Sequence, residues 1–189
     1  MTRPIDPKSL SHAMSHALRH EPESYGLHLD PEGWVALDAL IAALQAKRSA
    51  WRTLARSDIT RMMAAADKQR YELDGDRIRA LYGHSTPTRI SRDPAVPPGV
   101  LYHGTAPDLV AVILAEGLRP MSRQQVHLSA DQDTARQVGT RKDANPALLV
   151  VDTVGAGAAG VLFYHGGGPV WLAGAVPGRF IQPLDAMAG

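Results

Sequence analysis

One stretch indicates the fold of the first half of this 189-residue chain: Tyr71-Glu72-Leu73-Asp74-Gly75-Asp76-Arg77-Ile78-Arg79. Strand-forming residues stand on both sides of Asp74-Gly75, a dipeptide typical of the tight turn between two antiparallel strands. We therefore expect a two-stranded hairpin over these residues. Arg77 and Arg79 are two positions apart, so their side chains should point to the same face of the hairpin.

Three helices are expected before this hairpin. Apolar residues recur at helical spacing from Leu10 to Leu18, from Leu37 to Leu44 and from Ile59 to Ala66. Between the first two lies Asp30-Pro31-Glu32-Gly33, which carries proline and glycine where a type I turn favours them. Three helices followed by a two-stranded wing are typical of a winged-helix domain, which is common among nucleic-acid-binding proteins.

The first helix has a plausible N-cap in Ser9 and ends near Arg19-His20, because Glu21-Pro22 follows. Two interpretations of Arg19-His20 stay open on local grounds. The pair can simply interact favourably with the negative end of the helix dipole. It can also hold a phosphate, since the arginine fork matches two phosphate oxygens and the imidazole can donate or carry a proton.

A proline-rich segment separates two halves of different composition. We predict a winged-helix lobe over residues 1–92, a linker over residues 93–99, and a second lobe over residues 100–189. Residues 1–92 carry 14 basic and 11 acidic side chains, whereas residues 93–189 carry 6 and 8. A polyanion would therefore meet the first half, although ordinary surface charge explains the same difference.

The second half contains several short apolar runs and fewer helical patterns. We expect strands over residues 100–102, 126–128, 147–154, 161–164 and 170–172. Helices are expected over residues 107–116, where Gly117 follows, and over residues 131–138. Many short strands with few helices predict an α+β fold for this half.

Composition excludes several classes of protein. The chain has no cysteine, which rules out disulfides, thiol catalysis and thiolate metal sites. No apolar run approaches about 18 residues, and the first residues lack a signal-peptide pattern, so we expect a cytoplasmic protein that binds no membrane. His12 and His16 share a helix face, but no carboxylate completes an HExxH motif, so no metal is expected. A monomer is the default expectation.

Gly155-Ala156-Gly157-Ala158-Ala159-Gly160 matches the GxGxxG pattern of dinucleotide-binding loops. That fingerprint requires a helix to start within it and an acidic residue about 20 positions later. Strand-like Val161 to Tyr164 follow instead, and a glycine run comes after them. We therefore interpret the segment as a flexible connection between strands.

Together these segments resemble the RNA 2′-phosphotransferase family. The matching segments are Leu18-Arg19-His20, Gly33-Trp34-Val35, Lys68-Gln69-Arg70-Tyr71, Ile78-Arg79-Ala80, Gly83-His84-Ser85, Leu101-Tyr102-His103-Gly104-Thr105, Glu116-Gly117-Leu118, Met121 with Arg123, Val126-His127-Leu128-Ser129 and Val170-Trp171-Leu172. They keep the family's order from residue 10 to about residue 182. No single segment is decisive, but the ordered set is highly specific.

The resemblance implies an N-terminal winged-helix RNA lobe and a C-terminal ADP-ribosyltransferase-like lobe that holds NAD as co-substrate. Four catalytic residues follow from the motif matches, and we expect them to converge on one phosphate-sized site without a metal: Arg19, His20, Arg79 and Arg123. The NAD contacts implied by the motifs are His103, Gly104, Thr105, His127 and Ser129. Contacts to RNA are expected from the basic wing and its neighbours, namely Lys68, Arg70, Arg77 and His84.

The family removes the 2′-phosphate that some RNA ligases leave at a tRNA splice junction. The RNA 2′-phosphate attacks the nicotinamide-bearing ribose carbon of NAD, and nicotinamide leaves. The neighbouring ribose hydroxyl then attacks phosphorus, which releases 2′-OH RNA and ADP-ribose 1″,2″-cyclic phosphate. Two alternatives stay open: NAD-dependent ADP-ribosylation of terminal phosphates on nucleic acid, and a winged-helix binding module without activity.

The sequence departs from the family pattern in two places. Leu81-Tyr82 stand where the family usually has Asn-Gln, and Gln124-Gln125 stand where it usually has a histidine pair. Neither departure replaces a catalytic position. Val170 lies on the strand where many protein ADP-ribosyltransferases carry a catalytic glutamate, so no such carboxylate is expected here.

Overall fold

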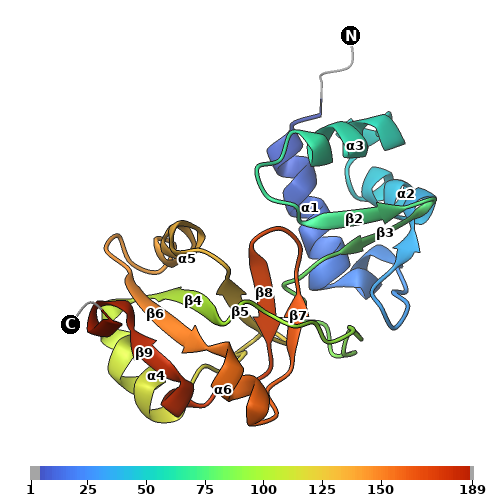
Figure 1. Cartoon of the computed structure of the whole chain (residues 1–189). Helices are drawn as coiled ribbons and strands as arrows, with labels where there is room; N and C mark the ends of the chain where they lie inside the picture. Colours follow the sequence, from blue (N-terminus) through green and yellow to red (C-terminus); the bar gives the residue numbers. More distant parts are fainter. Residues whose placement is uncertain (1–4, 188–189) are drawn as a thin grey trace. The chain divides into compact units, whose positions relative to one another are not determined.

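The computed structural model describes residues 5–187, which form a mixed fold of helices and two antiparallel sheets (Figure 1). The chain divides into two compact units between Ser91 and Arg92. Each unit has its own sheet and its own apolar core. The α+β class expected from the sequence is confirmed.

Helix α1 (Pro7–Arg19) opens the first unit. Its N-cap is Asp6, whose carboxylate accepts the backbone N–H of Ser9 at 2.9 Å. The expectation that Ser9 caps the helix is therefore wrong, because the stronger acceptor three residues earlier takes that role. The helix ends as predicted, with Arg19 in its last turn and His20 as its C-cap.

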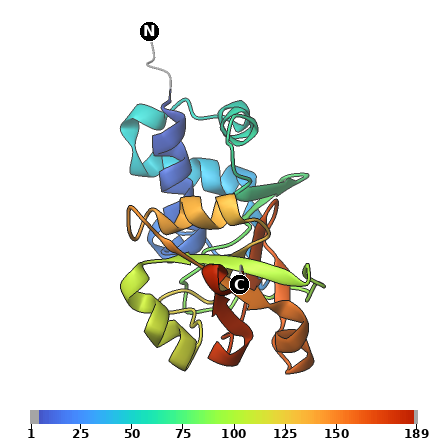
Figure 2. The ribbon, with the colours of Figure 1, turned by 60° about the vertical axis from the view of Figure 1, so that its left-hand side comes forward.

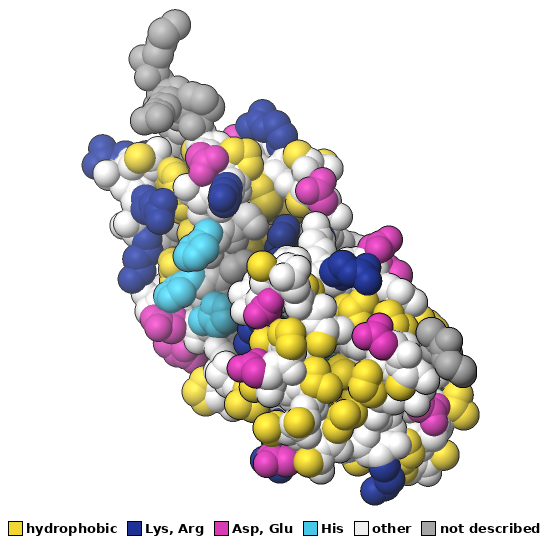
Figure 3. Space-filling model, turned by 90° about the vertical axis from the view of Figure 1, so that its left-hand side faces the viewer, with side chains coloured by type: hydrophobic (Ala, Val, Ile, Leu, Met, Phe, Trp, Pro, Cys, Tyr) yellow, Lys and Arg dark blue, Asp and Glu magenta, His cyan; other side chains and the backbone are white. Residues whose placement is uncertain are grey.

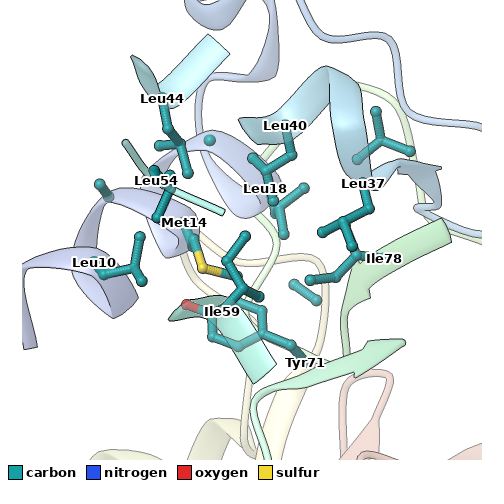
Figure 4. Close-up of a cluster of buried hydrophobic side chains, with 14 of the residues drawn as sticks. Leu10, Met14, Leu18, Leu37, Leu40, Leu44, Leu54, Ile59, Tyr71 and Ile78 are labelled. Carbon is teal, nitrogen blue, oxygen red and sulfur yellow. The ribbon is translucent and has the colours of Figure 1, made fainter. Parts of the chain in front are cut away.

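The two other predicted helices follow, and their apolar faces close the core of this unit. The remaining helical segments are α2 (Leu37–Lys47), α3 (Arg56–Ala64) and the short 3-10 turns η1 (Pro22–Tyr25) and η2 (Ser49–Trp51). Figure 4 shows the core, in which Met14 and Leu18 of α1 meet Leu40 of α2 and Ile59 of α3. Full burial of each such side chain contributes about 1.5–3 kcal/mol.

The predicted hairpin is confirmed as β2 (Tyr71–Asp74) and β3 (Arg77–Ala80). Gly75 has a φ of 55°, the left-handed conformation that a two-residue hairpin turn favours. A third strand, β1 (Val35–Ala36), pairs with β3, so the sheet order is β1-β3-β2. Only two strands were expected, because a two-residue strand leaves no alternation to detect.

The second unit is built on a six-stranded antiparallel sheet of order β7-β8-β5-β4-β6-β9. Its strands are β4 (Val100–Thr105), β5 (Val126–Ser129), β6 (Ala147–Asp152), β7 (Phe163–His165), β8 (Val170–Ala173) and β9 (Ile181–Pro183). Its helical segments are α4 (Val110–Glu116), α5 (Gln132–Gly139), α6 (Thr153–Ala158), η3 (Pro107–Leu109), η4 (Gly178–Phe180) and η5 (Leu184–Met187). Figures 1 and 2 show α5 on one side of β4, with α4 and α6 on the other.

The glycine-rich segment after β6 is not the flexible connection that we expected. It forms α6, because the Asp152 carboxylate caps it by accepting the N–H groups of Val154 and Gly155 at 3.1 and 3.0 Å. Thr153 and Ala156 are buried and anchor the helix. Its parent strand β6 is antiparallel to both neighbours, so the segment is not part of a parallel dinucleotide-binding unit.

The proline-rich segment before β4 has no helix or strand over residues 93–98. The backbone N–H of Ala95 donates to the carbonyl of Phe163 at 2.8 Å, so part of the segment packs on the second unit. None of the helices within residues 5–187 is long and apolar enough to cross a membrane.

Candidate active site

The Arg19 guanidinium lies in a fixed, largely buried position at the end of α1. Its Nη2 donates to the carbonyl of Arg70 at 3.2 Å. Its central carbon lies 5.5 Å from the ring centre of Tyr71 and 4.9 Å from that of Tyr82. A guanidinium that stacks on aromatic rings keeps its charge and its planar donor edges, which suits recognition of a phosphate.

Gly83 makes room for this guanidinium. It has a φ of 87°, and a Cβ built there would lie 3.4 Å from Nη1 of Arg19. Two residues later, the backbone N–H of Ser85 donates to the carbonyl of Arg19 at 2.9 Å. The Gly83-His84-Ser85 motif therefore lies directly against the helix end, although the two are separated by more than 60 residues.

His20 joins the same cluster. Its Nδ1 and the Ser85 hydroxyl form a hydrogen bond of 2.8 Å, while the ring stays exposed to solvent. The bond fixes the ring orientation and leaves Nε2 on the far side of the ring. Arg19, His20 and Ser85 therefore form one polar group with an accessible imidazole.

His20 is also the last of three histidines spaced four residues apart along α1. His12 is exposed, His16 is half-buried, and the His16 and His20 ring centres are 6.3 Å apart. Figure 3 shows histidines gathered on one face of the molecule. Within the described part of the chain, no group of three or more His, Asp or Glu side chains is placed to hold a metal ion.

The wing carries the second group of predicted residues. Arg77 and Arg79 do lie on one face, because their guanidinium carbons are 5.0 and 4.4 Å from the ring centre of Trp34. Nε and Nη2 of Arg79 each lie 2.7 Å from the Glu72 carboxylate, its partner across the hairpin. Arg77 is paired with Asp74 at 3.0 Å.

The remaining predicted RNA contacts differ in exposure. Lys68 and Arg70 are half-buried and lie on the segment that leads into β2. His84 is buried, with Nε2 only 3.6 Å from where a Cβ on Gly33 would lie. That burial does not favour a direct RNA contact by the His84 ring, and suits a role in packing the Gly83–Ser85 segment against the turn before Trp34.

In the second unit, Arg123 lies in the turn before β5. Its Nη1 donates to Nδ1 of His127, which must be the acceptor because arginine carries only donors. The proton of a neutral His127 ring therefore sits on Nε2. Met121, two residues before Arg123, has a φ of 57°, a left-handed conformation that is uncommon for residues other than glycine and fixes the turn.

His103 lies on β4 and its ring is held by β5. Its Nδ1 donates to the carbonyl of His127 at 2.9 Å, so a neutral ring presents Nε2 as an acceptor. Burial lowers the pKa of His103 below its usual value, and the positive charge of Lys142 acts in the same direction, against the hydrogen bond to His127. His103 is therefore a neutral hydrogen-bond acceptor at physiological pH.

Gly104, Thr105 and Ser129 lie near His103 on the same two strands. A Cβ on Gly104 would overlap the carbonyl oxygen of Ala135 in α5, so close packing of this helix accounts for glycine here. Thr105 and Ser129 are buried polar residues. Val170 pairs with Ser129 across β5 and β8, so this buried hydroxyl has an apolar neighbour on the next strand.

Within the first unit, the structure thus brings Arg19 and His20 together and puts Arg79 on the wing. Within the second, it joins Arg123 to His127 and His127 to His103. Sequence reasoning missed Glu72 as the partner of Arg79 and Tyr82 as a ring over Arg19. The pairing of Glu72 with Arg79 could have been predicted from the sequence, since a two-residue turn at Gly75 and Asp76 pairs residue 72 with residue 79. Tyr82 is a departure from the family pattern that touches a proposed catalytic residue after all.

Comparison with known proteins gives one consistent result. The family described as "RNA 2′-phosphotransferase, Tpt1 / KptA family" matches residues 6–175. A protein of Acetivibrio thermocellus named "Probable RNA 2′-phosphotransferase" is 47% identical over 178 residues, covering 94% of this chain and 97% of its own. Proteins with the same name from Pseudomonas paraeruginosa and Streptomyces griseus are 48% and 41% identical and cover 94% and 91% of this chain, and 99% and 94% of their own.

Proposed function

Since the chain belongs to the RNA 2′-phosphotransferase, Tpt1 / KptA family, we propose that it is an NAD-dependent enzyme that removes an internal 2′-phosphate from RNA. The products are 2′-OH RNA, nicotinamide and ADP-ribose 1″,2″-cyclic phosphate, and the substrate class is a spliced tRNA junction. The main support for the proposal is the family match over residues 6–175, which includes all the residues proposed to bind the phosphate, RNA or NAD.

The two units take different parts in this proposal. The unit that ends at Ser91 is a winged-helix lobe for RNA, supported by its three helices and its small sheet with a basic wing. The unit that begins at Arg92 is an ADP-ribosyltransferase-like lobe for NAD, supported by its six-stranded sheet and by the polar side chains of β4 and β5. We expect a cytoplasmic monomer, which stays a prediction.

Three cationic side chains and one imidazole bind the 2′-phosphate. Arg19 offers a fixed fork whose charge is supported by two aromatic rings. Arg79 and Arg123 add donors from the wing and from the turn before β5. Charge that builds on the phosphoryl oxygens during transfer is stabilised by such fixed donors, which can contribute about 3–4 kcal/mol each. A dianionic phosphate can be bound in this way by side chains alone.

His20 holds and moves the proton. Its Nδ1 is engaged with the Ser85 hydroxyl, so Nε2 is the nitrogen that can give a proton to the departing RNA 2′-oxygen. An imidazole performs this exchange near neutral pH. Ser85 keeps the ring from rotating and is therefore a positioning residue.

The polar side chains of β4 and β5 fit a dinucleotide with several hydroxyl groups. When bound, NAD supplies the ribose carbon that accepts the phosphate and the hydroxyl that closes the cyclic product. A neutral His103 can accept a hydrogen bond from a ribose hydroxyl at Nε2, since its Nδ1 is already committed to the His127 carbonyl. Thr105 on β4, with His127 and Ser129 on β5, supplies further polar side chains, while Gly104 lets α5 pack close against the sheet.

The test is a product analysis. The protein is incubated with NAD and an RNA oligonucleotide that carries one internal 2′-phosphate, and both nucleic acid and small molecules are separated. We expect 2′-OH RNA, nicotinamide and ADP-ribose cyclic phosphate in equal amounts. A stable ADP-ribosyl adduct on RNA, or on terminal phosphates only, would contradict the proposal in favour of simple ADP-ribosylation. RNA binding without any product would indicate a binding module.

A further inference from the structure

The first unit contains a cavity whose lining includes two of the predicted RNA contacts, Lys68 and Arg70. It has a volume of about 330 Å³ and lies among α1, α3 and the segment that leads into β2. Its lining consists of Ser11, Met62, Met63, Ala64, Ala66, Lys68, Gln69, Arg70 and Tyr71. This volume is at the lower end of the range for small-molecule pockets, which suits a group of the size of one nucleotide.

The wall of the cavity is apolar on one side and basic on the other. Met62, Met63 and Ala66 supply flexible and small apolar surface, against which a flat aromatic group can pack. Lys68 and Arg70 supply positive charge at the same opening. None of the lining residues within the described range 5–187 is acidic. An apolar wall with a cationic edge matches an aromatic base joined to a phosphate.

The cavity adjoins the surroundings of Arg19. Two of its lining residues also hold that guanidinium: Arg70 through its carbonyl, at 3.2 Å from Nη2, and Tyr71 through its ring. The Tyr71 hydroxyl donates to the carbonyl of Ser11 at 2.6 Å and lies 2.7 Å from the Ser15 hydroxyl, which ties this wall to α1. Figure 4 shows the Tyr71 ring at the border of the core, beside Ile59.

We propose that this cavity binds a nucleotide of the RNA strand that flanks the nucleotide carrying the 2′-phosphate, with its base against Met63 and Ala66 and its phosphate near Lys68 and Arg70. The inference rests on the proposed function, because it takes Arg19 as the site of the 2′-phosphate. It adds a substrate requirement: the enzyme reads a neighbouring base by packing rather than by hydrogen-bond pattern, so it discriminates a base from no base more than one base from another.

The test measures RNA binding without NAD, by fluorescence anisotropy. Two single-stranded oligonucleotides carry the same internal 2′-phosphate, and in one of them the flanking nucleotides have no base. The unmodified protein should bind the abasic strand about tenfold more weakly, the loss expected for one base contact. Ala66→Phe, which fills the cavity, should bind both strands equally. Ala46→Phe, the same change on the exposed face of α2, should keep the tenfold difference.

A tenfold difference that persists in Ala66→Phe would overturn the proposal. So would a loss of NAD affinity in Ala66→Phe with RNA binding unchanged, since the cavity would then belong to the dinucleotide. Thermal unfolding checks that the variant folds, and Met63→Ala, which only removes part of the wall, should reduce the difference about threefold. Because no turnover is needed, base discrimination without any 2′-phosphate removal would leave the cavity assignment standing while the proposed function fails.

Discussion

Two arginines of the first unit, both assigned to the same phosphate, are held in opposite ways. At the end of α1, the Arg19 guanidinium donates to a carbonyl and stacks on Tyr71 and Tyr82. On the wing, Arg79 stacks on Trp34 but also forms two 2.7 Å contacts with the Glu72 carboxylate. The first setting preserves positive charge, whereas the second largely cancels it.

This difference indicates that Arg19 and Arg79 have different roles in binding the phosphate. A largely buried guanidinium that contacts a carbonyl and two aromatic rings attracts a dianion strongly, because the interior screens charge less than water does. An arginine already paired with a carboxylate orients an incoming group at lower net attraction. We therefore expect Arg19 to dominate recognition of the 2′-phosphate and Arg79 to refine its position.

The largest effect should follow Arg19→Lys. Lysine keeps the charge but loses the planar fork and the aromatic stacking, so turnover of 2′-phosphorylated RNA should fall about a thousandfold. Steady-state kinetics measure this fall, and Arg52→Lys, at an exposed arginine of the same unit, should leave turnover unchanged. Near-normal activity of Arg19→Lys would contradict the expectation that Arg19 contributes more than Arg79 to recognition of the phosphate.

Arg123→Ala extends the comparison to the second unit. Arg123, like Arg19, donates to an uncharged acceptor, the Nδ1 of His127. Its removal should lower turnover about a hundredfold, because donors of this kind stabilise charge that develops on the phosphoryl group. Rapid-quench analysis of RNA products checks the effect. Full turnover by the variant would show that Arg123 is not part of the site.

Gly83→Ala should disturb the surroundings of the Arg19 guanidinium and leave those of Arg79 unchanged. The new Cβ would meet the guanidinium at 3.4 Å, the near limit of van der Waals contact, in a backbone conformation with a φ of 87°. We expect a loss of stability of about 1 kcal/mol and a roughly tenfold loss of turnover. Gly75→Ala is the matched control: its φ is also positive, but nothing lies within 4 Å of the added methyl.

In that control, urea unfolding should show a similar loss of stability while turnover stays unchanged. Equal losses of turnover in both variants would mean that backbone strain, rather than contact with Arg19, is responsible. The pair therefore separates the two causes.

Glu72→Gln should leave Arg79 without its carboxylate partner on the hairpin, so that its charge is no longer largely cancelled. Removal of the carboxylate frees the charge of Arg79, so RNA should bind about three- to tenfold more tightly. The dependence of affinity on salt should also steepen by about one phosphate contact. Anisotropy titrations at several salt concentrations measure both. Weaker binding would mean that Glu72 serves mainly to aim Arg79.

The smallest effect concerns pH and His103. Burial lowers the pKa of its ring, so the folded protein takes up this proton less readily than the unfolded chain. Stability associated with His103 is therefore complete above the usual histidine pKa and is lost as pH falls below it. His103→Asn should show a shallower loss of unfolding free energy between about pH 7.5 and about pH 5. An unchanged pH profile would contradict the lowered pKa.

Local patterns were sufficient for much of the fold. The helix that ends at Arg19 and the hairpin around Gly75 follow from periodicity and turn chemistry, which act over a few residues. The short strand at Val35 and the helix at Thr153 were not predicted. Their formation depends on a partner strand in one case and on a capping carboxylate before a glycine-rich run in the other.

The candidate site residues also include some that local patterns predict and some that only the folded structure shows. The motif matches named Arg19 and His20, but the contacts of Tyr82 and Ser85 with that helix end join positions more than 60 residues apart. No local pattern encodes such contacts. Burial of His84 is equally invisible in a sequence, because it depends on packing against the turn at Gly33.

The role of Arg19 is tested by comparing the affinities for two RNA oligonucleotides that differ only in one internal 2′-phosphate, without NAD and at one salt concentration. We expect the unmodified protein to prefer the phosphorylated strand about a hundredfold. Arg19→Lys should lose most of this preference. Arg77→Lys, on the ion-paired wing, should weaken both strands equally and keep it. A preference that survives in Arg19→Lys, or that disappears in Arg77→Lys, would contradict the assignment of the 2′-phosphate to the end of α1.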